Sequence, residues 1–147
     1  MQFDLKELGE VFEKRGLPSA EGFAAAEESV TYGTNCFDLV FSDEPYVALR
    51  LYYDNLNEKL RPVVVRIRVN KKLHSLGKEA LEAILPALLA AEEDEDVLLI
   101  AARPPKAKSL EELVEQMEEL ARSLRKLVGE EGGGLVGYAP ADCAPFL

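Results

Sequence analysis

The side chains that could carry out catalysis or bind a metal ion are few and widely separated in this chain. His74 is the only histidine, and the two cysteines, Cys36 and Cys143, lie far from it in the sequence. A zinc site needs several closely spaced ligands, and a cysteine nucleophile needs an adjacent base that a third group orients. The spacing supplies neither arrangement, so we expect no catalytic residue, no metal site and no cofactor.

The acidic and glycine-rich runs do not follow known ligand patterns either. Glu92–Asp96 is an unbroken run of acids, without the alternating ligands and central glycine of a calcium loop. Gly132-Gly133-Gly134 follows a predicted helix, whereas a phosphate-binding loop precedes one. We therefore expect a solvated connection at the acids and a flexible linker at the glycines.

One constellation that could bind a partner consists of arginines at alternate positions. Arg50 and Tyr52 lie in one predicted strand, and Arg66 and Arg68 lie in another. Alternate side chains of a strand share a face, and arginine and tyrosine are favoured at protein interfaces. These four residues predict a docking face for an acidic or extended partner. The alternative is a sheet face with cross-strand pairs, such as Asp38 with Arg50, covered by another element.

The elements that would position these arginines are strands with a period of two. Apolar residues alternate with polar ones through Cys36–Ser42, Tyr46–Asp54 and Arg61–Asn70. Such alternation is typical of a sheet buried on one face, so we predict a three-stranded antiparallel meander. Val97–Ala102 is a continuous apolar run that predicts a further, buried strand.

Two helices have clear signals at both ends. Asp4 with Glu7, and Ser109 with Glu112, form capping boxes, and a glycine follows each apolar stripe. We predict an N-terminal helix over Asp4–Arg15 and a long C-terminal helix after Ser109.

A third helix is predicted over residues 76–89, with a bend or break at Pro86. Its apolar face is wider than one covering helix needs. Part of the face could form a dimer interface, and a purely internal role remains the alternative. The residues concerned are Ile84, Leu85, Leu88 and Leu89.

The fold class that follows is α+β, with the helices packed on one face of the sheet. The chain has 147 residues, which suits one domain over residues 1–129 and a Gly-hinged apolar tail over 130–147. A net charge of −10 disfavours direct binding to nucleic acid or anionic membranes. No apolar run spans a bilayer, and the N-terminus lacks a signal peptide pattern. We therefore expect a cytoplasmic protein with both cysteines as thiols.

The order of elements resembles the type III secretion chaperone-like fold, including the YbjN-type proteins. The similar parts are Leu5–Leu17, a helix that ends in Gly16-Leu17, and Val97–Leu127. In the second part, a strand and a proline turn lead through Ser109-Leu110-Glu111-Glu112-Leu113 into a long helix. That fold has two strands between its last two helices, where this sequence shows one clear strand. The resemblance implies a homodimer that binds another protein without catalysis.

Three functional hypotheses follow from these observations. The leading one is a non-enzymatic protein-binding adaptor or chaperone-like regulator that acts through an exposed sheet or helix face. The alternative is a small acidic regulator that binds a basic surface of a nucleic-acid-handling machine, such as a transcription complex. The last is a degenerate nuclease-like or Cys-dependent hydrolase. The order of elements also resembles restriction-type nucleases, but Val64-Val65-Arg66-Ile67-Arg68 lacks the carboxylates that would hold Mg²⁺.

Overall fold

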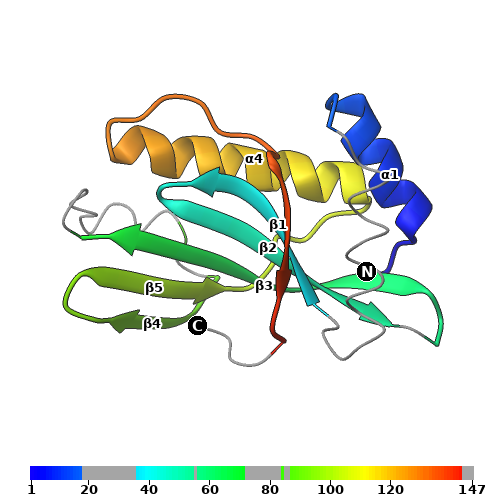
Figure 1. Cartoon of the computed structure of the whole chain (residues 1–147), viewed down its shortest axis with the longest axis horizontal. Coiled ribbons are helices and arrows are strands. Elements are labelled where there is room, and N and C mark those ends of the chain that lie inside the picture. The colour runs from blue at the N-terminus through cyan, green and yellow to red at the C-terminus, as the bar shows by residue number, and fades with distance from the viewer. Residues whose placement is uncertain (18–35, 55, 72–83, 85–86, 144–147) are drawn as a thin grey trace.

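In the part of the chain that the structure describes, a six-stranded antiparallel sheet forms the centre, and the helices α1 and α4 cover one of its faces (Figure 1). The computed structural model describes residues 1–17, 36–54, 56–71, 84 and 87–143. The strands lie in the order β4-β5-β3-β2-β1-β6. The elements are α1 (Leu5–Lys14), β1 (Cys36–Asp43), β2 (Tyr46–Asp54), β3 (Lys59–Asn70), β4 (Leu88–Glu93), β5 (Val97–Ala102), α4 (Leu110–Leu127) and β6 (Gly137–Ala141).

The α+β class is confirmed, but the sheet is larger than the predicted meander. β1, β2 and β3 are adjacent and antiparallel, as the period of two predicted. β5 joins β3 on one side, and β4 then joins β5. On the other side β6 pairs with β1, so the long helix α4 is followed by a further strand and does not end the fold.

The predicted helix over residues 76–89 is wrong at its C-terminal end. Leu88 and Leu89 are the first two residues of the strand β4, and Leu88 lies opposite Ala102 of β5. A short apolar run fits either a buried helix or a strand, and here pairing with β5 decides the outcome. Most of the remaining predicted helix lies outside the described residues.

Both predicted helix starts are confirmed. The Asp4 side chain accepts a hydrogen bond from the Glu7 N–H at 2.8 Å. Ser109 Oγ accepts one from the Glu112 N–H at 3.1 Å, and Glu112 accepts one from the Lys108 N–H at 2.8 Å. These bonds satisfy backbone donors that the first helical turn leaves without partners. Capping therefore fixes where each helix begins.

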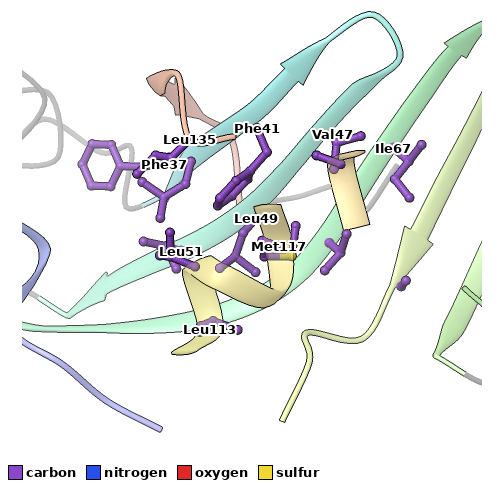
Figure 2. Close-up of a cluster of buried hydrophobic side chains, with 14 of the residues drawn as sticks. Phe37, Phe41, Val47, Leu49, Leu51, Ile67, Leu113, Met117 and Leu135 are labelled. Atoms are coloured by element: carbon purple, nitrogen blue, oxygen red, sulfur yellow. The ribbon is translucent and has the colours of Figure 1, made fainter. Parts of the chain in front are cut away.

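The core lies between this helix pair and the sheet. One set of alternating side chains from β1, β2, β3 and β5 points toward the helices and is buried with them. In Figure 2 Leu113 and Met117 of α4 lie among the strand residues, and Leu135 lies beside Phe37 and Phe41. Burying one side chain of this size stabilises the folded state by about 1.5–3 kcal/mol relative to leaving it exposed to water. The apolar face thus explains the period of two in the sequence.

The segment predicted as a hinged tail, residues 130–147, is described through residue 143 and contains the edge strand β6. The Gly134 N–H donates to the Phe41 carbonyl, and the Leu135 N–H donates to the Glu118 carboxylate at 3.0 Å. Leu135 is buried in the core. A Cβ on Gly133 would lie 3.0 Å from the Arg122 backbone nitrogen, so glycine is needed there for close packing. The run of glycines therefore lies against α4 and leads into the sheet.

The prediction that both cysteines are thiols is wrong, because Cys36 and Cys143 form a disulfide. The β1–β6 register places Ala141 opposite Cys36, and Cys143 follows two residues later. Their Cα atoms are 5.3 Å apart although 107 positions separate them in the sequence. In the chain-entropy model, closing so long a loop stabilises the folded state by about 4–5 kcal/mol. Sequence spacing alone could not reveal this pairing.

An ion-pair cluster joins the two helices. Arg15, just after α1, lies 2.9 Å from carboxylate oxygens of both Glu111 and Glu118 on α4. The hydrogen bond to Glu111 raises the pKa of Arg15, and the same bond lowers the pKa of Glu111. Burial alone would raise the pKa of Glu118, but hydrogen bonds from Arg15 and the Leu135 N–H lower it overall. Glu118 therefore links α1, α4 and the segment before β6.

Replacing Glu118 by Gln should lower the free energy of unfolding by about 2 kcal/mol near neutral pH, because Arg15 and Leu135 lose a charged acceptor. The pKa of Glu118 in the folded chain lies below its ordinary value of 4.5. Its stabilising contribution is thus present above that value and is lost as the pH falls through the lower folded-state pKa. The loss in free energy of unfolding caused by Glu118→Gln should therefore become smaller in acid. Urea unfolding at a series of pH values measures this loss.

The matched control is Glu115→Gln, on the same helix. Glu115 is exposed and has no ion-pair partner among the described residues, so we expect a change within about 0.5 kcal/mol. The role of the cluster would be contradicted if the loss of stability in Glu118→Gln stayed constant through the acid range. It would also be contradicted if this loss equalled that of Glu115→Gln.

Candidate functional site

The sheet face turned away from α1 and α4 carries the polar side chains that the sequence singled out. We call it the outer face. Because side chains alternate along a strand, the residues between the core positions of β1, β2, β3 and β5 point to this side. Its polar members include Asp38, Tyr46, Arg50, Tyr52, Arg61, Arg66 and Arg68, and the same register adds Asp54, Lys59 and Asn70.

A buried ion pair occupies the centre of the outer face. Asp38 of β1 lies directly opposite Arg50 of β2. Arg50 Nε donates to Asp38 Oδ1 at 2.9 Å, and its terminal nitrogen donates to Oδ2 at 3.3 Å. Each residue is only 3% exposed. The cross-strand pair of Asp38 with Arg50 is thus confirmed, and Arg50 is not on the surface where a partner could contact it.

Two further side chains converge on the same carboxylate. The Tyr46 hydroxyl donates to Asp38 Oδ2 at 2.8 Å, and the Arg66 guanidinium lies 3.8 Å from that oxygen. Burial, and then the charge of Asp38, raise the pKa of Tyr46, so its hydroxyl remains a donor near neutral pH. Burial and then the charge of Arg50 lower the pKa of Arg66. Arg50 and Arg66 thus both lie within ion-pair distance of Asp38.

An arginine lies over a tyrosine ring at each end of the β2–β3 pair. Arg68 is opposite Tyr46, with its guanidinium carbon 5.0 Å from the ring centroid. Arg61 is opposite Tyr52, at 4.9 Å. Both arginines are exposed. A cation–π contact attracts the guanidinium weakly to the face of the ring and so restrains its position. The outer face therefore presents two oriented guanidinium groups on either side of the buried ion pair.

The sequence prediction included Arg66, Arg68 and Tyr52 but missed Arg61 and Tyr46. Counting by twos from Arg66 places residue 61 on the core side. The register shifts between Arg50 and Leu51, however, so that β3 gains one extra residue and Arg61 returns to the outer face. A bulge of this kind has no clear sequence signal. Tyr46 was visible in the period of two, but its role depends on Asp38 in the neighbouring strand.

Two hollows adjoin the arginine–tyrosine pairs. One, of about 10 Å³, is lined by Tyr46, Arg66, Arg68 and neighbouring residues of β3 and β5. The other, of about 220 Å³, is lined by Tyr52, Arg61 and Lys59, together with Gln2, Leu60 and the acidic Asp54. The first has room for an oxygen-sized group and the second for a side chain. Both lie where an anionic group could reach a guanidinium.

Both edges of the sheet resist the addition of another strand. β6 contains Pro140, which has no N–H to donate. β4 has an irregular register between Leu88 and Ala90 and ends in the exposed acids Glu92 and Glu93. Bulges, prolines and charges are common protections for sheet edges. The outer face is therefore a better candidate for binding than either edge.

The residues predicted for a dimer interface do not form one helical face in the structure. Ile84 is buried, Leu88 is half-buried and Leu89 is 48% exposed at the start of β4. Leu85 lies outside the described residues. A dimer interface that includes these four residues stays a prediction.

Among the described residues, no group of three or more His, Cys, Asp or Glu side chains could hold a metal ion. His74 lies outside them. In the same part of the chain, no helix combines the length and apolarity needed to cross a membrane. No family model, curated protein or solved structure matches the chain, so the resemblance to the secretion chaperone-like fold stays a prediction.

Replacing Arg50 by Ala should lower the free energy of unfolding by about 3–5 kcal/mol, because Asp38 would remain buried without its main cationic partner. Urea unfolding measures the change. Arg68→Ala is the control from the same face. Arg68 is exposed and its contact with Tyr46 should contribute no more than about 1 kcal/mol. Equal losses in the two variants would contradict a central role for the Asp38–Arg50 pair.

Proposed function

We propose that this protein is a non-enzymatic protein-binding adaptor whose outer face binds an acidic segment of a partner protein. The observation that carries the proposal is the pair of exposed arginines, each held over a tyrosine on adjacent strands. Arginine and tyrosine are enriched among residues that dominate binding energy at protein interfaces. A planar guanidinium also binds carboxylates through two parallel hydrogen bonds.

The buried ion pair supports this proposal because it makes the outer face rigid before binding. Asp38 receives hydrogen bonds from Arg50 and from Tyr46, and the Arg68 guanidinium lies over the Tyr46 ring. The orientation of Arg68 is thus linked through Tyr46 to a carboxylate fixed inside the sheet. A surface that is already ordered loses less conformational entropy when a partner binds.

Charge supports an acidic partner. The whole chain carries a net charge of −10, yet Arg61, Arg66 and Arg68 lie on one face of β3, where Arg66 contacts Asp38 and Arg61 lies near Asp54. A local positive patch on an acidic protein favours one orientation of an acidic partner and repels it elsewhere.

A second candidate function rests on the acidic turn between β4 and β5. Residues 92–96 are all acidic and all exposed, and the Asp94 N–H bonds the Val97 carbonyl to close the turn. This turn could bind a basic surface, for instance on a transcription complex or another nucleic-acid-handling machine. A cytoplasmic location and a homodimer are part of either proposal.

Site-specific crosslinking would distinguish the two surfaces. We would place a photoreactive phenylalanine analogue at Tyr52 in one variant and at Glu95 in another, and identify crosslinked proteins in a lysate by mass spectrometry. We expect an acidic partner to be captured from position 52. Exclusive capture from position 95 would favour the acidic turn instead.

The Arg61→Glu/Arg68→Glu variant should then lose at least about tenfold in affinity for the captured partner, since two favourable charge contacts become repulsive. The control, Lys6→Glu/Lys126→Glu, changes the net charge equally but alters exposed residues at α1 and α4, on the other side of the sheet. Calorimetric titration with the purified partner measures both. Equal losses in the two variants would indicate a general charge effect and would contradict binding at the outer face.

A further inference from the structure

We propose that the hollow beside Tyr52 and Arg61 binds the side chain of a glutamate in the partner segment, and that an apolar neighbour of this glutamate contacts Leu56. The hollow has a volume of about 220 Å³ and lies at the end of the outer face where β2 leads into β3. The proposal rests on the acidic partner proposed above, and it adds which side chain of the partner binds at this end.

Two cross-strand pairs form one side of the hollow. Tyr52 of β2 lies opposite Arg61 of β3, and the next pair on the same face is Asp54 with Lys59. The guanidinium carbon of Arg61 lies 4.9 Å from the centroid of the Tyr52 ring. Two cations and one carboxylate thus line the hollow. A single additional carboxylate would make this group of charges neutral.

The N-terminal segment forms the other side of the hollow. It lies beside β3 at this end of the sheet (Figure 1). The Phe3 N–H donates to the Leu60 carbonyl at 3.0 Å, and the Leu60 N–H donates to the Phe3 carbonyl at 2.7 Å. Gln2, the residue before Phe3, lines the hollow. Backbone pairing on both sides of β3 therefore fixes the shape of the hollow before a ligand arrives.

The carboxylate of Asp54 is engaged by the turn between β2 and β3. Its Oδ1 accepts hydrogen bonds from the N–H groups of Leu56 at 2.9 Å and Asn57 at 3.4 Å, and its Oδ2 accepts one from the Asn57 side chain at 2.7 Å. The side-chain hydrogen bond from Asn57 is the main cause that lowers the pKa of Asp54. In the described part of the chain, the side chains of Lys59 and Arg61 form no ion pair or hydrogen bond. Their donors can therefore bind an added carboxylate.

The size of the hollow suits one side chain. Pockets that enclose a drug-sized ligand have volumes of about 300–1,000 Å³, which is more than this hollow offers. The hollow at the other arginine–tyrosine pair, Tyr46 with Arg68, has only about 10 Å³, enough for a water-sized group. Only the Tyr52 end can thus receive a whole side chain. Because the partner segment continues along the outer face, its carboxylate comes from a side chain and not from a chain end.

Leu56 offers an apolar contact beside the hollow. Its side chain is 94% exposed, more than any other large apolar side chain in the described chain. The hydrogen bond from its N–H to Asp54, which lines the hollow, orders its backbone. A leucine on an ordered turn can bury apolar surface against a partner with little loss of conformational entropy. The segment recognised here therefore combines a glutamate with a large apolar neighbour.

NMR titration of the isotope-labelled full chain with a short peptide tests this proposal. The probe is acetyl-Ser-Leu-Glu-Ser-amide, which has one carboxylate and no charged end. We expect saturable shifts of the backbone amides of Tyr52, Leu56 and Arg61 and of the Arg61 Nε–H, without comparable shifts at Arg68. Glutamine in place of the glutamate should weaken binding at least about tenfold, because both cations lose their charged acceptor. Serine in place of the leucine should weaken binding severalfold.

Variants of the protein assign the effect to the hollow. Lys59→Gln and Arg61→Gln should each weaken binding of the peptide at least about fivefold, because each removes one of the two cations. The control is Lys126→Gln, which removes an exposed cation from α4 on the other side of the sheet, and it should bind the peptide as the wild-type protein does. Unchanged amide signals of the core strands in each variant confirm that it is folded.

Several outcomes would overturn the proposal. Shifts centred on Tyr46 and Arg68 would place the glutamate at the other end of the outer face. Equal binding of the glutamine peptide, or no saturable shift at all, would show that the hollow does not bind this side chain. Tighter binding of the glutamine peptide with a free C-terminal carboxylate would assign the hollow to a chain end. The function proposed above fails on a different result, namely that no acidic partner is crosslinked from position 52.

Discussion

The buried ion pair between Asp38 and Arg50 is the constraint on which the arrangement of the sheet depends. It lies between β1 and β2, at the centre of the outer face, and it fixes the register of these two strands. A slip of one residue would turn every core side chain of a strand to the wrong face. It would also leave two charges buried without partners, at a cost of several kcal/mol each. The apolar face and the ion pair therefore select the same register independently.

The parts of the fold that could be predicted are those that local chemistry specifies. The period of two predicted β1, β2 and β3, and the capping boxes at Asp4 and Ser109 predicted α1 and α4, because these signals are short-range. β4 and β6 could not be predicted in the same way. An apolar run such as that around Leu88 fits two structures, and a segment with Gly137 and Pro140 is a poor strand in isolation. Both are strands because they pair with a neighbouring strand, β6 with β1 and β4 with β5.

The candidate site was predicted only in part for a related reason. Residues such as Arg66 and Arg68 share a strand, so alternation placed them together. The contribution of Arg61 depends on the register shift opposite Arg50, and the role of Tyr46 depends on Asp38 in the next strand. The pairing of Cys36 with Cys143 depends on β6 crossing from the end of α4 back to β1. Each missed feature is a contact between strands, which composition and periodicity do not record.

The disulfide lies at one end of the outer face, at Cys36. Across β1 and β2 this residue lies opposite Tyr52, and across β1 and β6 it lies opposite Ala141. The disulfide thus adjoins the Tyr52–Arg61 end of the outer face, whereas the Tyr46–Arg68 end lies near the other end of β2. The Asp38–Arg50 pair lies two residues further along the same strand. The disulfide and the ion pair therefore hold β1 from its two sides, the first across β6 and the second across β2.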